Sequence, residues 1–309
     1  METIIWPRCG PAFEPAALLA GTLLLPTTAW AAPITFNTAL PVSTGQWLIR
    51  EQYIQLQRDD ANTVPDLNVH VDALANVLAY GVDSELALFA EVPWYLDKTL
   101  RVTTPMGRLA RSDAGIGDTK LFARYTIIQH DAPGRGLRVA ALGGVIAPTG
   151  SSDKTDRYGP LPRSFQNGTG AWGGLGGVVA TYQTLNWEAD ADATYQATGT
   201  QNAYRAGAVN ELDGSFQYRL WPRTLAGGAP AFVYGVLETN LVRTTADRMN
   251  GANTLNTGGT QWFITPGVQY VTMNYILETA VQLPLAQNMN GNALRDAYIF
   301  HIGFRVHIQ

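Results

Sequence analysis

Apolar and polar residues alternate with a period of two along much of the chain. Between Trp187 and Ala197 every second residue is apolar, and the residues between them are polar and include three carboxylates. Successive side chains of a β-strand point to opposite faces, so this segment predicts a strand with one apolar and one acidic face. Residues 298–308 repeat the pattern with six large apolar side chains on one face. This length is typical of a membrane-crossing strand, which needs roughly 9–11 residues, rather than of a soluble strand of roughly 5–6.

Similar alternation predicts twelve strands, and their connections differ in length at the two ends. Mostly short turns lie at one end and mostly longer loops at the other. Outer-membrane barrels have this arrangement, whereas a sandwich with Greek-key crossings would not sort its loops in this way. The predicted fold is therefore all-β, a transmembrane antiparallel up-and-down β-barrel of about 12 strands. The expected strands are 46–58, 68–80, 84–95, 117–129, 137–148, 171–184, 187–198, 203–220, 230–242, 260–271, 274–287 and 295–308.

The first residues of the chain predict an export signal. Arg8 precedes an apolar stretch at 16–25, and residues 29–31 (Ala-Trp-Ala) place small side chains before a cut ahead of Ala32. These are the parts of a secretory signal peptide. A buried helix or a transmembrane anchor is the alternative, but the apolar run is short for a span of about 20 residues. We therefore expect a signal peptide at 1–31, a barrel at 32–309 and a location in the bacterial outer membrane.

Composition narrows the class of protein further. The 309 residues are 46% hydrophobic and 15% charged, whereas a typical soluble domain is roughly 25% charged. Disorder requires high charge, and a helical membrane protein requires long apolar runs that the sequence lacks. The single cysteine, Cys9, falls within the expected leader, so no disulfide scaffold is expected. Without the leader the chain keeps 20 basic and 23 acidic residues, and this net charge of −3 gives no reason to expect a nucleic-acid partner.

In a membrane barrel the polar face of each strand points into the lumen. Charged residues on that face would set the polarity of a pore, as rings of charge do in channels. Alternatively, the charges pair across neighbouring strands and fill a narrow interior, because twelve strands lie between the filled eight-stranded and the open sixteen-stranded case. The pore-lining candidates are Asp118, Lys120, Arg124, Arg138, Glu188, Asp190, Asp192, Arg205, Glu211, Asp213, Arg219, Glu238, Glu278, His301 and Arg305.

Two glycine-rich stretches carry a family resemblance. Residues 115–125 (Gly-Ile-Gly-Asp-Thr-Lys-Leu-Phe-Ala-Arg-Tyr) and 143–150 (Gly-Gly-Val-Ile-Ala-Pro-Thr-Gly) are followed by more glycines within 168–177. In layout, residues 45–309 resemble the outer-membrane proteins grouped as the MetA-pathway of phenol degradation family. The resemblance implies a passive barrel linked to uptake of aromatic or other small hydrophobic compounds, and it brings no catalytic residues.

The expected location also implies partners. An outer-membrane barrel contacts the lipid bilayer and lipopolysaccharide. The last strand resembles the C-terminal signal that the barrel-assembly machinery reads in outer-membrane proteins, although it ends in Gln309 rather than an aromatic residue. The sequence does not name the small hydrophobic solute.

Two other classes of function stay open beside transport. An outer-membrane lipase or protease would need a nucleophile and a histidine near one rim. His301 and His307 share a face of the last strand, and closure of the barrel would bring His70 near them as the third member of such a cluster. Because no zinc-site spacing or hydrolase motif occurs, we expect no catalytic residue, metal or cofactor.

The second class is a structural or interaction barrel that moves no solute. In it, the loops at 96–116, 149–170 and 243–259 would fold inward as a plug or outward as a contact surface. Residues 33–45, ahead of the first strand, either enter the lumen as a small hatch or form a loose periplasmic tail.

Overall fold

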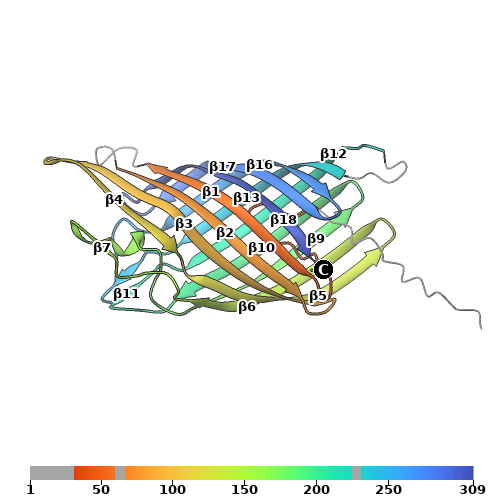
Figure 1. Ribbon diagram of the computed structural model, residues 1–309, viewed down its shortest axis with the longest axis horizontal. Coiled ribbons are helices and arrows are strands. Elements are labelled where there is room, and N and C mark those ends of the chain that lie inside the picture. Colours follow the sequence, from red (N-terminus) through yellow and green to blue (C-terminus); the bar gives the residue numbers. More distant parts are fainter. Residues whose placement is uncertain (1–30, 60–66, 225–230, 309) are drawn as a thin grey trace, which may run out of the picture.

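The computed structural model describes residues 31–59, 67–224 and 231–308. Within these residues twelve strands form a closed antiparallel barrel (Figure 1), in which the first strand pairs with the last. The all-β barrel expected from the sequence is confirmed. Apart from residue 31, the expected signal peptide lies outside the described residues. The wall consists of β1 (Trp47–Asp59), β2 (Asn68–Gly81), β3 (Leu86–Thr104), β5 (Thr119–Ala132), β6 (Arg135–Ala147), β9 (Gly173–Thr184), β10 (Trp187–Thr198), β12 (Val209–Trp221), β13 (Ala231–Thr244), β16 (Gly259–Thr272), β17 (Tyr275–Met289) and β18 (Arg295–Ile308).

The two faces of the wall differ as the alternation requires. Large apolar side chains such as Leu121, Trp262 and Leu277 are exposed on the outside. Charged and amide side chains such as Glu238 and Gln269 are buried on the inside. This distribution is the reverse of that in a soluble protein, and it suits a barrel whose outer face meets lipid. No helix in the described part of the chain is long and apolar enough to cross a membrane.

The two ends of the barrel have different connections. We call one end the turn end, because its turns 82–85, 133–134, 185–186 and 273–274 are short. The opposite end, the loop end, carries the longer connections. Short elements lie in them, namely β7 (Thr155–Asp156), β8 (Gly159–Pro160), the 3-10 helix η1 (Arg163–Phe165), β11 (Tyr204–Arg205), β14 (Arg248–Met249) and β15 (Ala252–Asn253).

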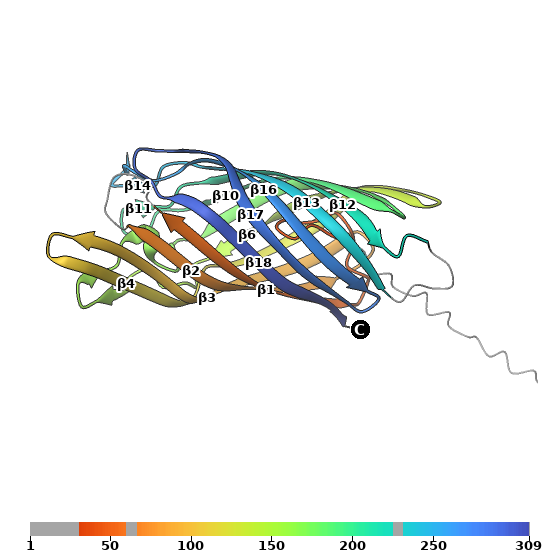
Figure 2. The same cartoon turned by 90° about the horizontal axis from the view of Figure 1, so that it is seen from above.

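The expected loop at 96–116 is instead a hairpin. β3 continues to Thr104 and pairs with β4 (Gly107–Ile116), so the hairpin extends beyond the rest of the wall at the loop end (Figure 2). β4 and β5 together are the neighbour of β3, with a break between them at residues 117–118. The turn signal is in the sequence, since Pro105 precedes Gly107, which adopts a positive φ of 119° that favours glycine.

A second difference concerns the strand expected at 203–220. Its barrel part, β12, begins only at Val209, and residues 204–205 form β11 in a separate small sheet. Tyr204 anchors that sheet, because its buried hydroxyl donates to Asp247 at 2.9 Å. Gly207 also donates its N–H to Asp247 at 2.8 Å, so the chain turns there before it enters the wall.

Loop 149–170 folds inward over the loop end. Leu161 and Phe165 pack on Val69 and Val71, which point into the lumen from β2. Lys98 of β3 donates to the carbonyl of residue 166 at 3.0 Å, which ties the loop to the hairpin. The loop therefore lines the mouth of the barrel with apolar side chains.

An ion pair at the outer edge of this loop gives a prediction about pH. Arg111 of β4 binds both carboxylate oxygens of Asp156, each at 2.8 Å. The side-chain hydrogen bond from Arg111 lowers the pKa of Asp156 below its ordinary value of 3.8. Since the pKa is lowered, the ionised pair stabilises the loop above pH 3.8, and this contribution is lost as the pH falls through the lowered pKa.

We therefore expect faster hydrogen exchange of the amides of residues 155–160 in the Asp156→Asn variant at pH 7. Below the pKa of Asp156, the wild-type and variant loops should exchange at the same rate, after correction for the intrinsic pH dependence. Equal protection of this loop in the two proteins at pH 7 would contradict the prediction.

Candidate functional site: a plugged lumen

Residues 32–43, which we call the plug, lie inside the barrel near the turn end. Of the two possibilities left open by the sequence, a hatch or a periplasmic tail, the structure has the hatch. Ile34 and Ala39 are fully buried. The chain leaves the lumen beside Gly81, whose N–H and carbonyl bond to the backbone of Gln46 and Gly45 before β1 begins. The first segment of the chain therefore fills part of the lumen that the strands enclose.

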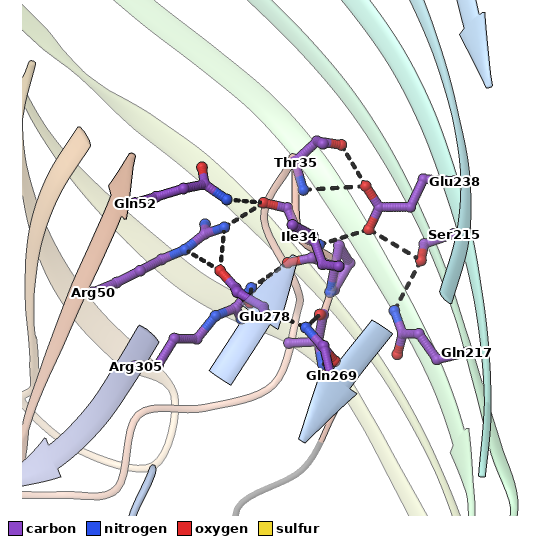
Figure 3. A network of polar contacts seen from close by, with 12 residues as sticks. Ile34, Thr35, Arg50, Gln52, Ser215, Gln217, Glu238, Gln269, Glu278 and Arg305 are labelled. Atoms are coloured by element: carbon purple, nitrogen blue, oxygen red, sulfur yellow. Dashed lines mark hydrogen bonds and ion pairs between the residues drawn. The ribbon is translucent and has the colours of Figure 1, made fainter. Parts of the chain in front are cut away.

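Glu238 of β13 binds the start of the plug (Figure 3). Its carboxylate accepts the N–H of Ile34 at 2.6 Å, the N–H of Thr35 at 3.1 Å and the hydroxyl of Thr35 at 2.5 Å. The plug has no strand partner at this point, so a wall carboxylate satisfies two backbone donors that would otherwise be buried without one. Hydrogen bonds to a charged acceptor are stronger than neutral ones, so Glu238 is the main acidic anchor.

An ion triad binds the carbonyl groups on the same stretch. Glu278 of β17 pairs with Arg50 at 2.9 Å and with Arg305 at 2.8 Å, and its side chain is fully buried. The two guanidinium groups also donate to plug carbonyls, Arg50 to Ile34 and Arg305 to Pro33 (Figure 3). Because Glu278 neutralises part of their charge, the arginines can remain buried and still bind the plug backbone.

Amide side chains complete this anchor. Gln269 of β16 donates to the carbonyl of Ala32 at 2.6 Å and to Glu278 at 3.1 Å. Gln52 of β1 donates to the carbonyl of Ile34 at 3.0 Å. The first four residues of the plug are thus bound by side chains from β1, β13, β16 and β18, and the backbone there contacts a specific polar surface.

The second half of the plug crosses to the opposite wall. The hydroxyl of Thr38 lies 3.0 Å from that of Thr181 on β9 and donates to Asp190 on β10 at 3.2 Å. Ala39 donates its N–H to Thr181 at 2.8 Å. Arg124 of β5 donates to the carbonyl of Thr38 at 2.7 Å and also to that of residue 40. Anchors on both sides of the lumen therefore hold the plug across it.

The inner wall beside the second half is apolar. Ala39 and Val42 of the plug belong to a buried cluster on β2, β3, β5, β6 and β9. Phe89 and Phe122 stack there with ring centroids 4.8 Å apart. The remaining wall members of the cluster are Ala79, Ala87, Ala140, Leu142 and Val179. The plug thus covers an apolar strip that is able to contact a hydrophobic molecule.

The barrel is filled at the level of the plug. The wall side chains Gln217, Glu238, Thr265 and Gln269 have no more than 1% of their surface exposed. A side chain that water cannot reach does not line an open channel. This part of the lumen wall is therefore covered, and a solute could pass along it only if the plug moved.

Gly81 leads to a prediction about the close contact between the wall and the end of the plug. A Cβ at this position would lie 2.3 Å from the carbonyl oxygen of Ser43 and 2.5 Å from that of Val42. Gly81→Ala should therefore push the end of the plug from the wall, at a cost of about 1–3 kcal/mol, which is typical of overpacking. We expect a lower midpoint of thermal unfolding in detergent micelles, by roughly 2–4 °C for each kcal/mol.

The matched control is Gly143→Ala. A Cβ at Gly143 would have no atom within 4 Å. This variant should unfold at the wild-type temperature, and a Gly81→Ala barrel that also unfolds there would show that the plug does not need this close approach.

The candidates on β10 and β12 form an acidic strip in the lumen. Glu188, Asp190 and Asp192 point inward from β10, and Glu211 and Asp213 point inward from β12. Asp190 accepts hydrogen bonds from Thr181, Thr38 and Gln217. Among the described residues, none of the five carboxylates is in a salt bridge. Their charge is therefore not balanced by a direct cationic partner.

Other candidates lie in the lumen with partners of their own. Lys120 pairs with Glu91 at 3.0 Å. Arg219 donates to Asn186 at 2.5 Å, and its guanidinium lies 5.8 Å from the centroid of the Phe232 ring. Lys120 follows the alternative interpretation of the sequence, in which charges pair across strands, whereas the partners of Arg219 are a neutral amide and an aromatic ring.

Three candidates do not line the central lumen. Asp118 accepts the N–H groups of Gly150 and Thr169, so it holds loop 149–170 at the loop end. Arg138 pairs with Asp131 at 3.1 Å near the tip of the β5–β6 hairpin. Arg205 lies in β11 and not in the wall, because the barrel strand β12 begins later than expected. It donates to the carbonyl of Thr198 at 3.1 Å.

The histidines do not form a cluster. The Nε2 of His301 lies 2.9 Å from Gln282 within the lumen. His70 lies beside Asp72 at 3.1 Å, on the face of β2 opposite to the inward-pointing Val69 and Val71. Among the described residues, no group of three or more histidine, cysteine or acidic side chains is arranged to hold a metal ion.

The sequence analysis did not identify four non-acidic residues that bind the plug backbone. Arg50, Gln52, Thr181 and Gln269 were not among the candidates. Alternation gave a signal for Gln269, which lies between apolar neighbours on β16. It gave little for Arg50 and Gln52, because inward positions of β1 include apolar as well as polar residues.

The fold resembles that of solved outer-membrane proteins. The structure of the COG4313 outer membrane channel from Pseudomonas putida F1 superposes with a TM-score of 0.65 at 12% identity, covering 90% of this chain and 100% of that one. The beta domain of the Bordetella autotransporter BrkA has a TM-score of 0.43 at 14% identity, with 86% and 100% covered. The CymD monoaromatic hydrocarbon channel has a TM-score of 0.39 at 8% identity, with 86% and 89% covered. The last two scores are too low to carry an argument.

Sequence comparison places the chain in a family. No curated protein is detectably similar in sequence. A family model matches residues 56–288, which is well over half of the chain. The glycine-rich stretches at 115–125 and 143–150 lie within the matched part. The chain therefore belongs to the family described as "Putative MetA-pathway of phenol degradation".

Proposed function

We propose that the protein is a passive channel of the bacterial outer membrane that takes up small hydrophobic or aromatic compounds, and that the plug is its gate. The observation that carries this proposal is the construction of the plug. It is bound by side-chain hydrogen bonds to the wall, and it is not a strand of the sheet. A segment held in this way can leave the lumen while the barrel stays intact.

The proposed class of solute rests on three observations. The plug covers an apolar strip that includes Phe89 and Phe122. The mouth at the loop end is lined by Leu161, Phe165 and the inward valines of β2. The family is named for phenol degradation, and the solved barrel with the TM-score of 0.65 is described as an outer membrane channel. An apolar mouth and an apolar strip favour a hydrophobic solute. The polar lipopolysaccharide layer slows the passage of such a solute through the membrane itself.

A role as an enzyme has less support. Among the described residues, His301 is hydrogen-bonded to Gln282 and to no serine hydroxyl, and His70 lies outside the lumen. A lipase or protease of the usual kind needs a histidine in contact with its nucleophile. If the purified barrel hydrolyses lipid and the His301→Ala variant does not, this result would support an enzymatic function.

Uptake in whole cells tests the proposal. Cells with an intact lipopolysaccharide layer should take up radiolabelled toluene faster when they express the protein than when they do not. The amount of folded barrel is measured by its heat-dependent mobility on gels. Equal uptake rates with abundant folded barrel would favour a structural role.

A further inference from the structure

Asp192 is buried in the lumen without a partner. Only 2% of its surface is exposed, and neither carboxylate oxygen has a hydrogen bond to any of the described residues. A buried polar atom without a partner is rare in proteins, because the loss of water is not compensated. A carboxylate in this state needs a proton or a cation that binds there.

The neighbour of Asp192 in the sheet is another carboxylate. Asp192 and Asp213 face each other in the register of β10 and β12, and both point inward. Side chains opposite each other in an antiparallel pair have Cβ atoms about 4.5–5.5 Å apart, so a single donor group can reach both. Asp213 accepts one hydrogen bond, from Asn240 at 3.0 Å, and so keeps acceptor capacity.

No cationic side chain completes this pair. Within the part of the chain that the structure describes, neither residue is in a salt bridge, and Glu211 adds electrostatic repulsion to both. Lys120 attracts Glu211, but its ammonium group is hydrogen-bonded to Glu91 at 3.0 Å. The described residues thus give this pair no direct cationic partner.

An apolar surface borders the pair. On its other side, Asp192 is in register with Val179 of β9. Val179 is fully buried and belongs to the same cluster as Phe89 and Phe122. A molecule at this position would meet a carboxylate at one end and an aliphatic and aromatic surface at the other.

The pair lies on the loop-end side of the plug. Asp190, two residues closer to the turn end on β10, contacts Thr38 of the plug. Asn240 contacts both Thr35 of the plug and Asp213. The pair therefore lies between the loop end and the contacts that β10 makes with the plug.

We infer that Asp192 and Asp213 form a binding subsite for the ammonium group of a small amphiphilic amine, with the apolar part of the molecule against Val179 and its cluster. This inference rests on the proposed function and specifies a solute class for the same lumen. A primary ammonium carries three donors and can bind two carboxylates at once. A metal ion would need a fuller shell of ligands, which the described residues do not provide.

Binding to the purified, full-length barrel in detergent tests the inference. The probe is benzylammonium at pH 7, and its uncharged analogue is benzyl alcohol. We expect saturable binding of benzylammonium by equilibrium dialysis, at least tenfold weaker in Asp192→Asn/Asp213→Asn, and no such difference for benzyl alcohol. Asp83→Asn, at a turn outside the wall, is the matched control and should bind as the wild type does.

The outcomes separate the subsite from the channel. Equal binding of benzylammonium to the wild type and the double variant would overturn the inference, because the carboxylates would then be protonated or otherwise satisfied. The single variant Asp192→Asn gives the same test if the double variant does not fold. Toluene uptake by cells measures the proposed channel independently, since toluene carries no charge, and it should not change in Asp192→Asn.

Discussion

Replacing Glu238 by alanine is expected to release the plug and to open the barrel to ions. The substitution removes the acceptor of three hydrogen bonds from Ile34 and Thr35. Bonds to a charged group contribute about 1.5–3 kcal/mol each, and their effects are not additive. A loss of about 3 kcal/mol from the closed state would raise the equilibrium constant for release of the plug by about 100-fold.

Planar bilayer recordings measure this effect directly. The wild-type barrel should be closed most of the time, and Glu238→Ala should show frequent large openings. Glu238→Gln should lie between them, because it keeps one acceptor oxygen for the plug and loses the charge. A chain that lacks residues 32–43 should remain open, and its conductance defines the fully open level.

The matched control removes a carboxylate elsewhere in the lumen. Glu211 points inward from β12, and its one hydrogen bond among the described residues is from Thr194 at 3.3 Å and not from the plug. Glu211→Ala changes the charge of the lumen by the same amount as Glu238→Ala but should leave the barrel closed. If folded Glu238→Ala opens no more often than Glu211→Ala, then Glu238 does not hold the gate.

The wall was predictable because lipid imposes a strict pattern on it. β10 and β18 have the bounds that alternation indicated, 187–198 and 295–308. In these strands every outward residue must be compatible with lipid, so the two faces differ sharply in polarity. β1 is less regular, because its inward positions include Leu48 and Leu56 as well as Arg50. The plug and the loop 149–170 cover those apolar side chains, so the lumen face there does not need to be polar.

The plug could be suspected from the sequence but not placed. Residues 32–43 have no period that predicts a strand or a helix, and their partners are far away along the chain. Ile34 is 204 residues from Glu238, and Ala39 is 142 residues from Thr181. Such pairings depend on how the closed barrel brings its strands around the lumen. The alternation within one strand contains no information about these pairings. It predicts that the carboxylates face inward, but it does not predict which groups they bind.

A disulfide across the lumen is expected to lock the gate. The hydroxyl oxygens of Thr38 and Thr181 lie 3.0 Å apart, so cysteine side chains at these two positions would point toward each other. In Thr38→Cys/Thr181→Cys, oxidation should tie the plug to β9. The sequence contains no cysteine after Cys9, so no native thiol within the described residues competes for the bond.

The lock is most informative in a barrel that already opens. Introduced together with Glu238→Ala, the oxidised cysteine pair should suppress the frequent openings, and a reductant should restore them in the same membrane. Each single cysteine variant with Glu238→Ala should conduct with or without reductant. Thr38 and Ala39 contact Thr181 in the closed position, so complete release of the plug requires residue 38 to leave β9. Openings that persist in the fully oxidised protein would mean that ions pass the plug without displacing it, and the gate would then have to lie elsewhere in the lumen.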